Sequence, residues 1–288
     1  MFIYISDLHL SDKQPISRVD SVFNAGMYKL EYVLKRAKEL NTFVVCGGDF
    51  FHEPRVSYKM LNSVMDLLNK YKVDVYTVFG NHDLIGVNQL DEGAAIFTLI
   101  KSGLLKQLDS LQIDSYIFET LHYTKEIPQA YFFKTKTTKK NVTRVLVVHN
   151  ALIPEKARFD HILLSDFKTD ANIVLCGHIH QFWDKTVKGV RFISPSCLVR
   201  RSISEKDHVP ALILVGDKIE VEKIPLNYQS EWCVTTSDEV TKALYSAIND
   251  SKIEASHIED YINSSDYEKK VKEFCLERVA QVRADNAN

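Results

Sequence analysis

The sequence contains few cysteines, and their spacing does not suit cross-linking. Five cysteines occur among the 288 residues, and no two of them form a Cys-x-x-Cys motif. An odd number of cysteines without paired spacing argues against a disulfide framework and against a zinc ribbon. These absences suit a reducing compartment, so we expect a cytoplasmic protein.

Long apolar runs are also missing. No run approaches the roughly 20 residues that a helix needs to cross a bilayer. The first ten residues, MFIYISDLHL, show no basic segment followed by an apolar stretch, so we expect no export signal. The sequence therefore predicts no membrane partner.

The sequence also lacks an excess of charge of one sign. The net charge is −2, with 45% hydrophobic and 26% charged residues, which is typical of a globular protein. Nucleic acid would not be attracted by the surface as a whole, so binding would need a local patch, a metal site or a partner. The length allows one large domain, or one and a fraction, with a substantial core.

Short apolar runs recur along the chain, and their continuous composition is typical of strands covered on both faces. Two segments repeat apolar residues at three- and four-residue steps, which predicts amphipathic helices over 20–41 and 57–71. Strands that alternate with helices of this length indicate a layered α/β fold with mixed sheets. The expected strands are 2–5, 43–46, 73–79, 145–148, 173–176, 190–193 and 211–215.

The end of the chain differs from the rest. The segment ALILVGDKIEVEKIPL predicts a hairpin that turns at Gly216-Asp217. Beyond it, residues 237–283 are polar with thin apolar seams at helical spacing. We therefore expect a main domain over 1–226 and a helical extension over 227–288, which is either a reduced capping element or a segment that docks on a partner.

Five predicted strands end in side chains that can bind metal ions. In α/β folds, ligands bind outside the carboxyl ends of the strands. Six of the ten histidines lie at or just after such ends. One histidine in such a position is usually a surface residue, but five ends of this kind together indicate one site. The residues concerned are Asp7 and His9, Asp49 and His52, Asn81, His82 and Asp83, His149, and His178 and His180.

The ligand types narrow the chemistry. Imidazole, carboxylate and carboxamide groups without thiolate suit Mn²⁺, Fe²⁺, Zn²⁺ or similar ions. Seven candidate ligands exceed what one ion needs and match two ions that share a bridging carboxylate. Such a pair holds an oxyanion, lowers the pKa of a bound water and stabilises in-line displacement at phosphorus. We expect two divalent ions, with Mn²⁺ first and Mg²⁺, Fe²⁺ or Zn²⁺ as alternatives.

These strand ends also carry the motifs of a known superfamily. The blocks D-x-H, GD, GNH[DE], H and GHxH are present in order as DLH, GGD, GNHD, His149 and GHIH. The chain thus resembles the calcineurin-like metallophosphoesterases over about its first 225 residues. The resemblance implies a four-layer sandwich of two mixed β-sheets flanked by helices. It also implies that one ion is held by Asp7, His9 and His180, the other by Asn81, His149 and His178, and both by Asp49.

The same resemblance gives roles to the remaining strand-end residues. His82 would contact the scissile phosphate and stabilise charge or protonate the leaving oxygen, and Asp83 would orient His82. The loop GGDFFHEPRVS resembles that of the exonuclease subunit of double-strand-break-repair and SbcCD-type nucleases, in a minimal or phage-type form. Protein serine/threonine phosphatases have GDxVDRG there instead. His52 would then help to seat the nucleotide beside the metals.

Partners follow from this resemblance as well. It implies a DNA or RNA substrate, a coiled-coil ATPase subunit of the SbcC type, and a homodimer. Only about 60 residues follow the core, which is too few for both a full capping domain and a full docking segment. A nuclease needs phosphate contacts away from the metals. The candidates, each also readable as a solvated surface residue, are Lys13, Arg18, Arg55, Lys134, Lys136, Arg200 and Arg201.

Three functions remain open from the sequence. The first is a two-metal nuclease with exonuclease or endonuclease action in DNA repair or recombination. The second is a phosphodiesterase or phosphatase that acts on small molecules or cyclic nucleotides. The third is a non-catalytic scaffold, which the complete ligand set disfavours.

Overall fold

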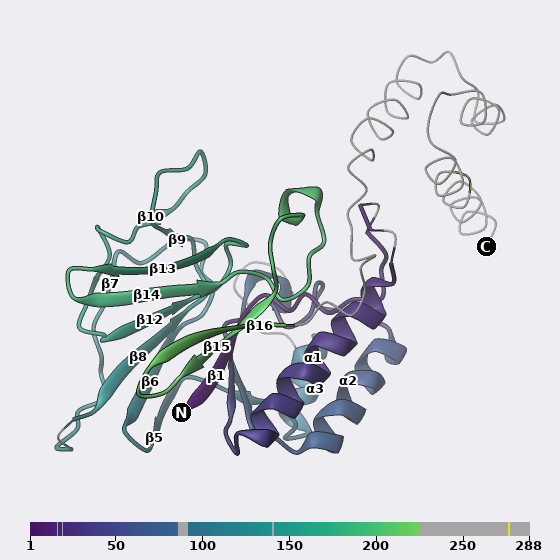
Figure 1. Cartoon of the computed structure of the whole chain (residues 1–288), viewed down its shortest axis with the longest axis horizontal. Coiled ribbons are helices and arrows are strands. Elements are labelled where there is room, and N and C mark those ends of the chain that lie inside the picture. The colour runs from purple at the N-terminus through teal and green to yellow at the C-terminus, as the bar shows by residue number, and fades with distance from the viewer. Residues whose placement is uncertain (16, 19, 86–91, 140, 225–275, 277–288) are drawn as a thin grey trace, which may run out of the picture.

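The fold is built on two six-stranded mixed sheets that pack face to face (Figure 1). A computed structural model describes residues 1–15, 17–18, 20–85, 92–139, 141–224 and 276. The first sheet contains, in spatial order, β16 (Ile219–Lys223), β15 (Ala211–Val215), β1 (Phe2–Ile5), β2 (Val44–Cys46), β3 (Val75–Thr77) and β4 (Lys106–Gln107). The second contains β13 (Phe182–Val187), β14 (Val190–Pro195), β12 (Ile173–Cys176), β8 (Thr143–Val148), β6 (Tyr116–Leu121) and β5 (Ser110–Ile113).

Parallel pairing brings the motif-bearing strand ends together. Strands β1, β2, β3 and β4 run parallel, and β15 and β16 form an antiparallel hairpin at the edge. In the second sheet β6, β8, β12 and β14 run parallel, with antiparallel edge strands β5 and β13. The residues that follow β1, β2, β3, β8 and β12 therefore lie at the carboxyl ends of these strands, where α/β folds bind ligands.

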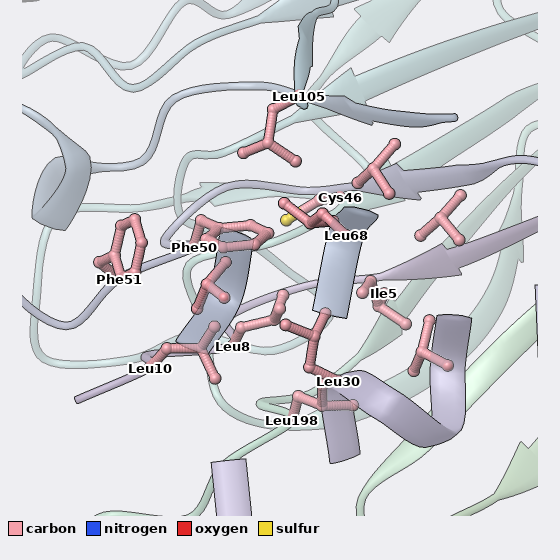
Figure 2. Close-up of a cluster of buried hydrophobic side chains, with 14 of the residues drawn as sticks. Ile5, Leu8, Leu10, Leu30, Cys46, Phe50, Phe51, Leu68, Leu105 and Leu198 are labelled. Carbon is pink, nitrogen blue, oxygen red and sulfur yellow. The ribbon is translucent and has the colours of Figure 1, made fainter. Parts of the chain in front are cut away.

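The side chains of β1 point alternately into two hydrophobic cores, one on each face of the first sheet. Ile3 and Ile5 pack in the core between the first sheet and the helices, whereas Phe2 and Tyr4 pack in the core between the two sheets. This is the period of two that a pleated strand imposes. Figure 2 shows the helix-side core continuing into the loops that carry the motifs, through Leu8 and Phe50. The loop backbones are thus anchored by buried apolar side chains.

In the part of the chain that the structure describes, three helices cover the outer face of the first sheet (Figure 1). They are α1 (Val22–Glu39), α2 (Tyr58–Tyr71) and α3 (Ala95–Lys101). Ser21 and Ser57 cap α1 and α2 by accepting hydrogen bonds from the first turn. The predicted helices and the hairpin are confirmed. The short α3 was not predicted from the sequence.

The outer face of the second sheet is covered differently. Four two-residue strands lie in this layer: β7 (Ala130–Tyr131), β9 (Leu152–Ile153), β10 (Ile162–Leu163) and β11 (Lys168–Thr169). The two-sheet α/β sandwich is confirmed, and its fourth layer consists of these strands and their connections. The predicted extension over 227–288 lies outside the described residues, apart from Leu276. Within the described part of the chain, no helix is long and apolar enough to cross a membrane.

A buried carboxylate, Glu119 in β6, ties the outer layer to the second sheet. It is 2% exposed and accepts hydrogen bonds from the Tyr131 hydroxyl (2.8 Å) and the backbone N–H groups of Lys134 (3.0 Å) and Thr135 (2.7 Å). Burial raises the pKa of Glu119, but these hydrogen bonds outweigh burial and hold the pKa below its ordinary value. The folded protein therefore favours the ionised carboxylate.

Replacing Glu119 by glutamine is expected to lower the free energy of unfolding at pH 7 by about 1–3 kcal/mol, because the donors lose a charged acceptor. A lowered folded pKa stabilises the fold above the unfolded pKa of about 4.3, and this stabilisation is lost as pH falls through the folded pKa. The difference between wild type and variant should therefore shrink at low pH in urea titrations. Glu155→Gln, at an exposed position, is the control. A pH-independent difference would contradict the argument.

Candidate metal centre

The loops after the strands hold their polar residues in unusual backbone conformations. Among the described residues, Asp7, His9, Asp49 and His178 have φ values of +52°, +45°, +51° and +80°. Non-glycine residues in this region cost about 1–3 kcal/mol each and occur mainly at functional sites. Four of the seven candidate ligands therefore sit in backbone conformations that the surrounding structure must enforce.

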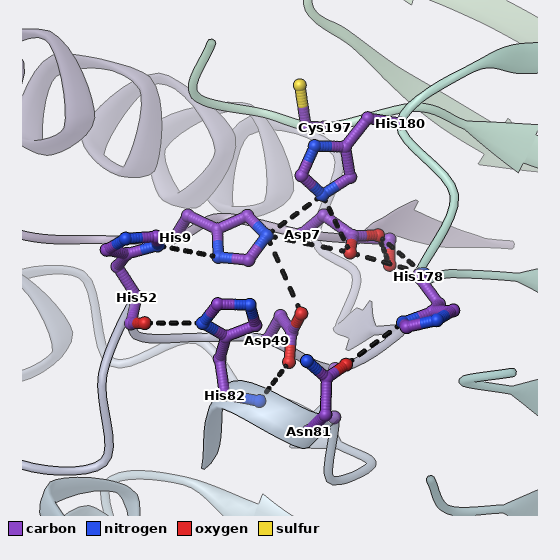
Figure 3. Close-up of polar contacts among 12 residues, drawn as sticks. Asp7, His9, Asp49, His52, Asn81, His82, His178, His180 and Cys197 are labelled. Carbon is purple, nitrogen blue, oxygen red and sulfur yellow. Dashed lines mark hydrogen bonds and ion pairs between the residues drawn. The ribbon is translucent and has the colours of Figure 1, made fainter. Parts of the chain in front are cut away.

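The first ligand group contains one carboxylate and two imidazoles (Figure 3). The Nε2 atoms of His9 and His180 lie 2.9 Å apart. They lie 3.8 Å and 3.5 Å, respectively, from Oδ1 of Asp7. Asp7 and His9 are almost fully buried. These three ligand atoms converge on one point, although His180 is 171 positions from His9.

The second ligand group lies beside the first. His149 Nε2 is 3.4 Å from Oδ2 of Asp49, and His178 Nδ1 is 2.9 Å from Oδ1 of Asn81. The same Oδ2 atom of Asp49 is 3.5 Å from His9 Nε2 in the first group. Asp49 therefore stands between the two groups, in the position that a shared ligand would occupy. The structure thus brings all seven predicted ligands together at one edge of the sandwich.

His149 shows that this cluster suits a cation. Its Nδ1 lies 2.6 Å from the carbonyl oxygen of Gly47, which can only accept, so Nδ1 carries the proton. Its Nε2 is buried and has no hydrogen-bond partner among the described residues. Because Nε2 faces the Asp49 carboxylate, a positive charge is favoured between the two atoms, either the ring's own proton or a bound cation. The residues present therefore fit divalent metal ions.

The pKa values of His149 and Asp49 also indicate that the cluster attracts positive charge. Burial alone would lower the pKa of His149, but the charge of Asp49 and its contact with the ring raise it to about 9. Burial raises the pKa of Asp49, and the neighbouring His149 more than offsets this. Asp49 therefore stays ionised and attracts positive charge, whether it is a proton on His149 or a bound cation.

Gly80 allows the ligands to approach so closely. A Cβ atom at Gly80 would lie 2.0 Å from Oδ1 of Asp49 and 2.6 Å from Nε2 of His149. Neither atom can move without displacing a ligand. A residue with a side chain therefore cannot replace the glycine of the GNHD motif without displacing Asp49 or His149.

His82 and His52 lie over the first ligand group. Their rings stack at 5.0 Å with an interplanar angle of 23°, and the His82 ring is 4.7 Å from that of His9. The His82 backbone N–H donates to Asp49 (2.9 Å), and its Nδ1 lies 2.5 Å from the His52 carbonyl oxygen. Burial and the nearby Arg201 lower the pKa of His52 to about 4. The backbone carbonyl and the ring of His52 both contact the His82 ring and hold it in place.

The predicted role of Asp83 is corrected by the structure. Asp83 is buried, and its carboxylate accepts from the backbone N–H groups of Phe50 and Gly80, each at 3.0 Å. Burial and the charge of Asp49 raise its pKa to about 7. His82 Nδ1 faces the His52 carbonyl instead. Asp83 therefore links the loops after β2 and β3 and does not orient the His82 ring.

Glu205 is a site residue that the sequence did not reveal. It lies in the 3₁₀ turn Ile203–Glu205, is 8% exposed, and forms a short hydrogen bond with His180 Nδ1. Its other oxygen accepts from the backbone N–H groups of Arg201 and Ser202. A carboxylate that holds the far nitrogen of an imidazole ligand fixes the ring and raises its basicity. No motif marks Glu205, because it lies 25 positions after His180.

Replacing Glu205 by glutamine is expected to weaken metal binding about 10- to 100-fold, the usual loss when such an outer partner is removed. Titration calorimetry of metal-free protein with Mn²⁺ would measure this without any substrate. Glu155→Gln serves as the control for loss of one surface carboxylate. Equal affinity in the Glu205 variant and in wild type would show that Glu205 does not support the site.

Two of the predicted phosphate contacts are wrong. Arg18 is 1% exposed, binds Asp20 through two hydrogen bonds (2.8 and 2.6 Å) and donates to the Arg200 carbonyl oxygen (2.5 Å). Arg200 is 3% exposed and donates to the carbonyl oxygens of Lys206 and His208. Both side chains are buried and bound to protein groups, so they hold loops together.

Lys134 and Lys136 also lie away from the metal cluster. They are exposed and lie on the outer side of the second sheet, where the backbone N–H of Lys134 donates to Glu119 of β6. Their role as phosphate contacts stays a prediction.

Lys13, Arg55 and Arg201 remain near the cluster. Lys13 and Arg55 line a cavity of about 300 Å³ together with Glu53, the residue after His52, and Lys13 pairs with Glu53 at 2.5 Å. Arg55 is exposed and makes no ion pair within the described part of the chain. Arg201 donates to the Lys13 carbonyl oxygen (3.1 Å). These three cations form a rim beside His52.

The fold and the cluster together define a class of protein. The Asp, Asn and His side chains gathered at the strand ends of two packed mixed sheets are of the types that can hold a pair of metal ions against a phosphate ester. The family model for the calcineurin-like phosphoesterase superfamily domain matches residues 1–216. The chain therefore belongs to the calcineurin-like phosphoesterase superfamily, a metal-dependent family of phosphoester hydrolases. The resemblance stated from the sequence is confirmed.

Individual relatives are more distant. The chain is 24% identical over 197 residues to the DNA double-strand break repair protein Mre11 of Methanococcus maripaludis, a match that covers 62% of this chain and 51% of that protein. The chain thus spans about half the length of this relative. An archaeal phosphodiesterase is similar with a TM-score of 0.42 and 13% identity, covering 77% of this chain and 99% of its own. The protein TT1561 of Thermus thermophilus gives a TM-score of 0.46 and 10% identity, covering 78% of this chain and 98% of its own.

Proposed function

We propose that the protein is a two-metal phosphodiesterase that cleaves nucleic acid. The observation that carries the proposal is the position of Asp49, whose Oδ2 lies 3.4–3.5 Å from an imidazole of each ligand group. One ion would be held by Asp7, His9 and His180, the other by Asn81, His149 and His178, and Asp49 would contact both. When bound, the ions would neutralise the phosphate oxygens and activate a water for in-line attack. We propose Mn²⁺ for both positions.

His82 is the residue we assign to the leaving oxygen. Because its Nδ1 faces a carbonyl oxygen, Nδ1 keeps its proton, and Nε2 is the atom that can exchange one with the substrate. The stacked His52 ring and the backbone bond to Asp49 hold this orientation. The chain thereby places a general acid beside the ligand cluster before the substrate arrives.

Two observations favour nucleic acid over a small phosphodiester. The curated relative is named as a DNA double-strand break repair protein. Arg55, which is exposed beside the His52 loop and forms no ion pair within the described part of the chain, offers a positive charge to a phosphate flanking the scissile one, whereas Lys13 is paired with Glu53. A coiled-coil ATPase subunit and a second copy of the chain are further proposed partners, on the resemblance alone.

A nuclease assay tests the proposal. Purified protein with Mn²⁺, Mg²⁺ or Zn²⁺ is incubated with labelled single-stranded, blunt and nicked DNA, with RNA, and with cyclic AMP and bis(p-nitrophenyl) phosphate. We expect cleavage of nucleic acid with Mn²⁺. Hydrolysis of the small esters alone would replace the proposal by a small-molecule phosphodiesterase. No hydrolysis and no binding of Mn²⁺ by calorimetry would favour a scaffold.

A further inference from the structure

A second cavity, of about 500 Å³, opens beside His180. Phe182, the first residue of β13, and Val221 in β16 line it from the two edge strands of the facing sheets. Val209, from the segment that precedes β15, lines it as well. We call this space the sheet-edge cavity. Its volume lies within the range of about 300–1,000 Å³ that is usual for small-ligand sites.

Exposed apolar side chains gather in the sheet-edge cavity. Seven large hydrophobic residues are exposed in the described part of the chain, and three of them line this one cavity. Phe182 is 49% exposed, Val209 40% and Val221 43%. Apolar groups that cluster at a surface hollow, rather than scattering singly, mark a place where a ligand binds.

Polar groups stand at the margin of the same cavity. Gln181 and Asp207 line it, and their side chains form no hydrogen bond or ion pair within the described part of the chain. An amide and a carboxylate together offer donors and acceptors for the edge of a heterocycle. The cavity therefore combines an aromatic face with unused hydrogen-bonding groups.

His180 connects this cavity to the metal centre. Its Nε2 belongs to the first ligand group, 3.5 Å from Asp7, and the same residue forms part of the cavity wall. The cavity and the candidate metal centre therefore share His180 as a common wall. We propose that the sheet-edge cavity binds a nucleobase adjacent to the scissile phosphate, with Phe182 stacked on its face. This inference rests on the proposed function. Stacking tolerates every base, because every base has a π-face.

A double-mutant cycle between Phe182 and the base tests the inference. Wild type and Phe182→Ala are compared on short oligonucleotides that carry either a normal or an abasic residue on each side of the scissile bond. On the normal substrate, kcat/KM of the variant should fall roughly 5- to 150-fold, the equivalent of about 1–3 kcal/mol per stacked base. On the substrate that lacks the stacked base, the two proteins should be equal.

Matched variants keep the test specific. Phe132 (59% exposed) and Phe159 (51% exposed) do not line the cavity, so their alanine variants should behave as wild type. Phe182→Tyr, which keeps the ring, should restore the loss. An equal effect of Phe182→Ala on normal and abasic substrates, or a lower melting temperature with no effect on kcat/KM, would overturn the inference. Failure of wild type to cleave any oligonucleotide would instead refute the proposed function.

Discussion

His82→Ala is expected to lower kcat for phosphodiester hydrolysis by roughly 10²- to 10⁴-fold, the usual contribution of a general acid. The His82 ring lies 4.7 Å from that of His9 and is fixed by the His52 carbonyl, so it is held beside the ligand cluster. The variant should still bind metal, because the contact of His82 with Asp49 uses its backbone N–H. Steady-state kinetics and Mn²⁺ calorimetry on the same preparation would measure both properties.

The control for this experiment is His161→Ala, which removes a histidine on the connection between β9 and β10. Circular dichroism would show that the variants are folded. If His82→Ala kept more than about a tenth of the wild-type kcat, another group would have to serve the leaving oxygen. Loss of metal binding in His82→Ala would show that the ring holds the cluster together.

Asp49→Asn is expected to abolish activity and to lower the number of bound Mn²⁺ ions. Its Oδ2 atom stands within 3.5 Å of both ligand groups, so one substitution removes charge from each. The loss of affinity should exceed the roughly 10- to 100-fold effect expected for the outer residue Glu205. Calorimetric stoichiometry with Mn²⁺ measures this directly.

Stability gives an independent measure of the same change. In metal-free protein, Asp49 is the buried counter-charge of His149. Removing one partner of a buried pair costs about 3–5 kcal/mol, so the variant should unfold at lower urea concentration. Asp184→Asn, which breaks the surface pair with Arg191, is the matched control and should have little effect. Two Mn²⁺ ions still bound with wild-type affinity would refute the bridging role.

The sequence predicted which side chains gather at the strand ends, but it did not predict the contacts of the residues around them. Asp7, Asp49 and His149 each follow a short apolar strand closely, and parallel pairing then fixes where they meet. Backbone periodicity and strand order therefore suffice to predict that these side chains meet, whereas their assignment as metal ligands comes from the family resemblance. Asp83 was misjudged because motif order says nothing about the direction of a side chain, which here depends on backbone donors from two loops.

Other parts depend on contacts between distant segments. Arg18 is buried because it reaches Arg200, 182 positions away, and Glu205 is a site residue only because its turn folds against His180. The two-residue strands β7, β9, β10 and β11 are too short to show any periodicity. The helix α3 has seven residues and no side-chain cap, so no start signal marked it.

The origin of the ligands from both sheets has a mechanical consequence. Asp7, Asp49 and Asn81 follow strands of the first sheet, whereas His149 and His178 follow strands of the second. Metal ions bound by residues of both groups would therefore link the two sheets to each other. The number of bound ions would then determine how far the two sheets can separate at this edge. The rigidity of the protein would therefore depend on the concentration of free metal ions.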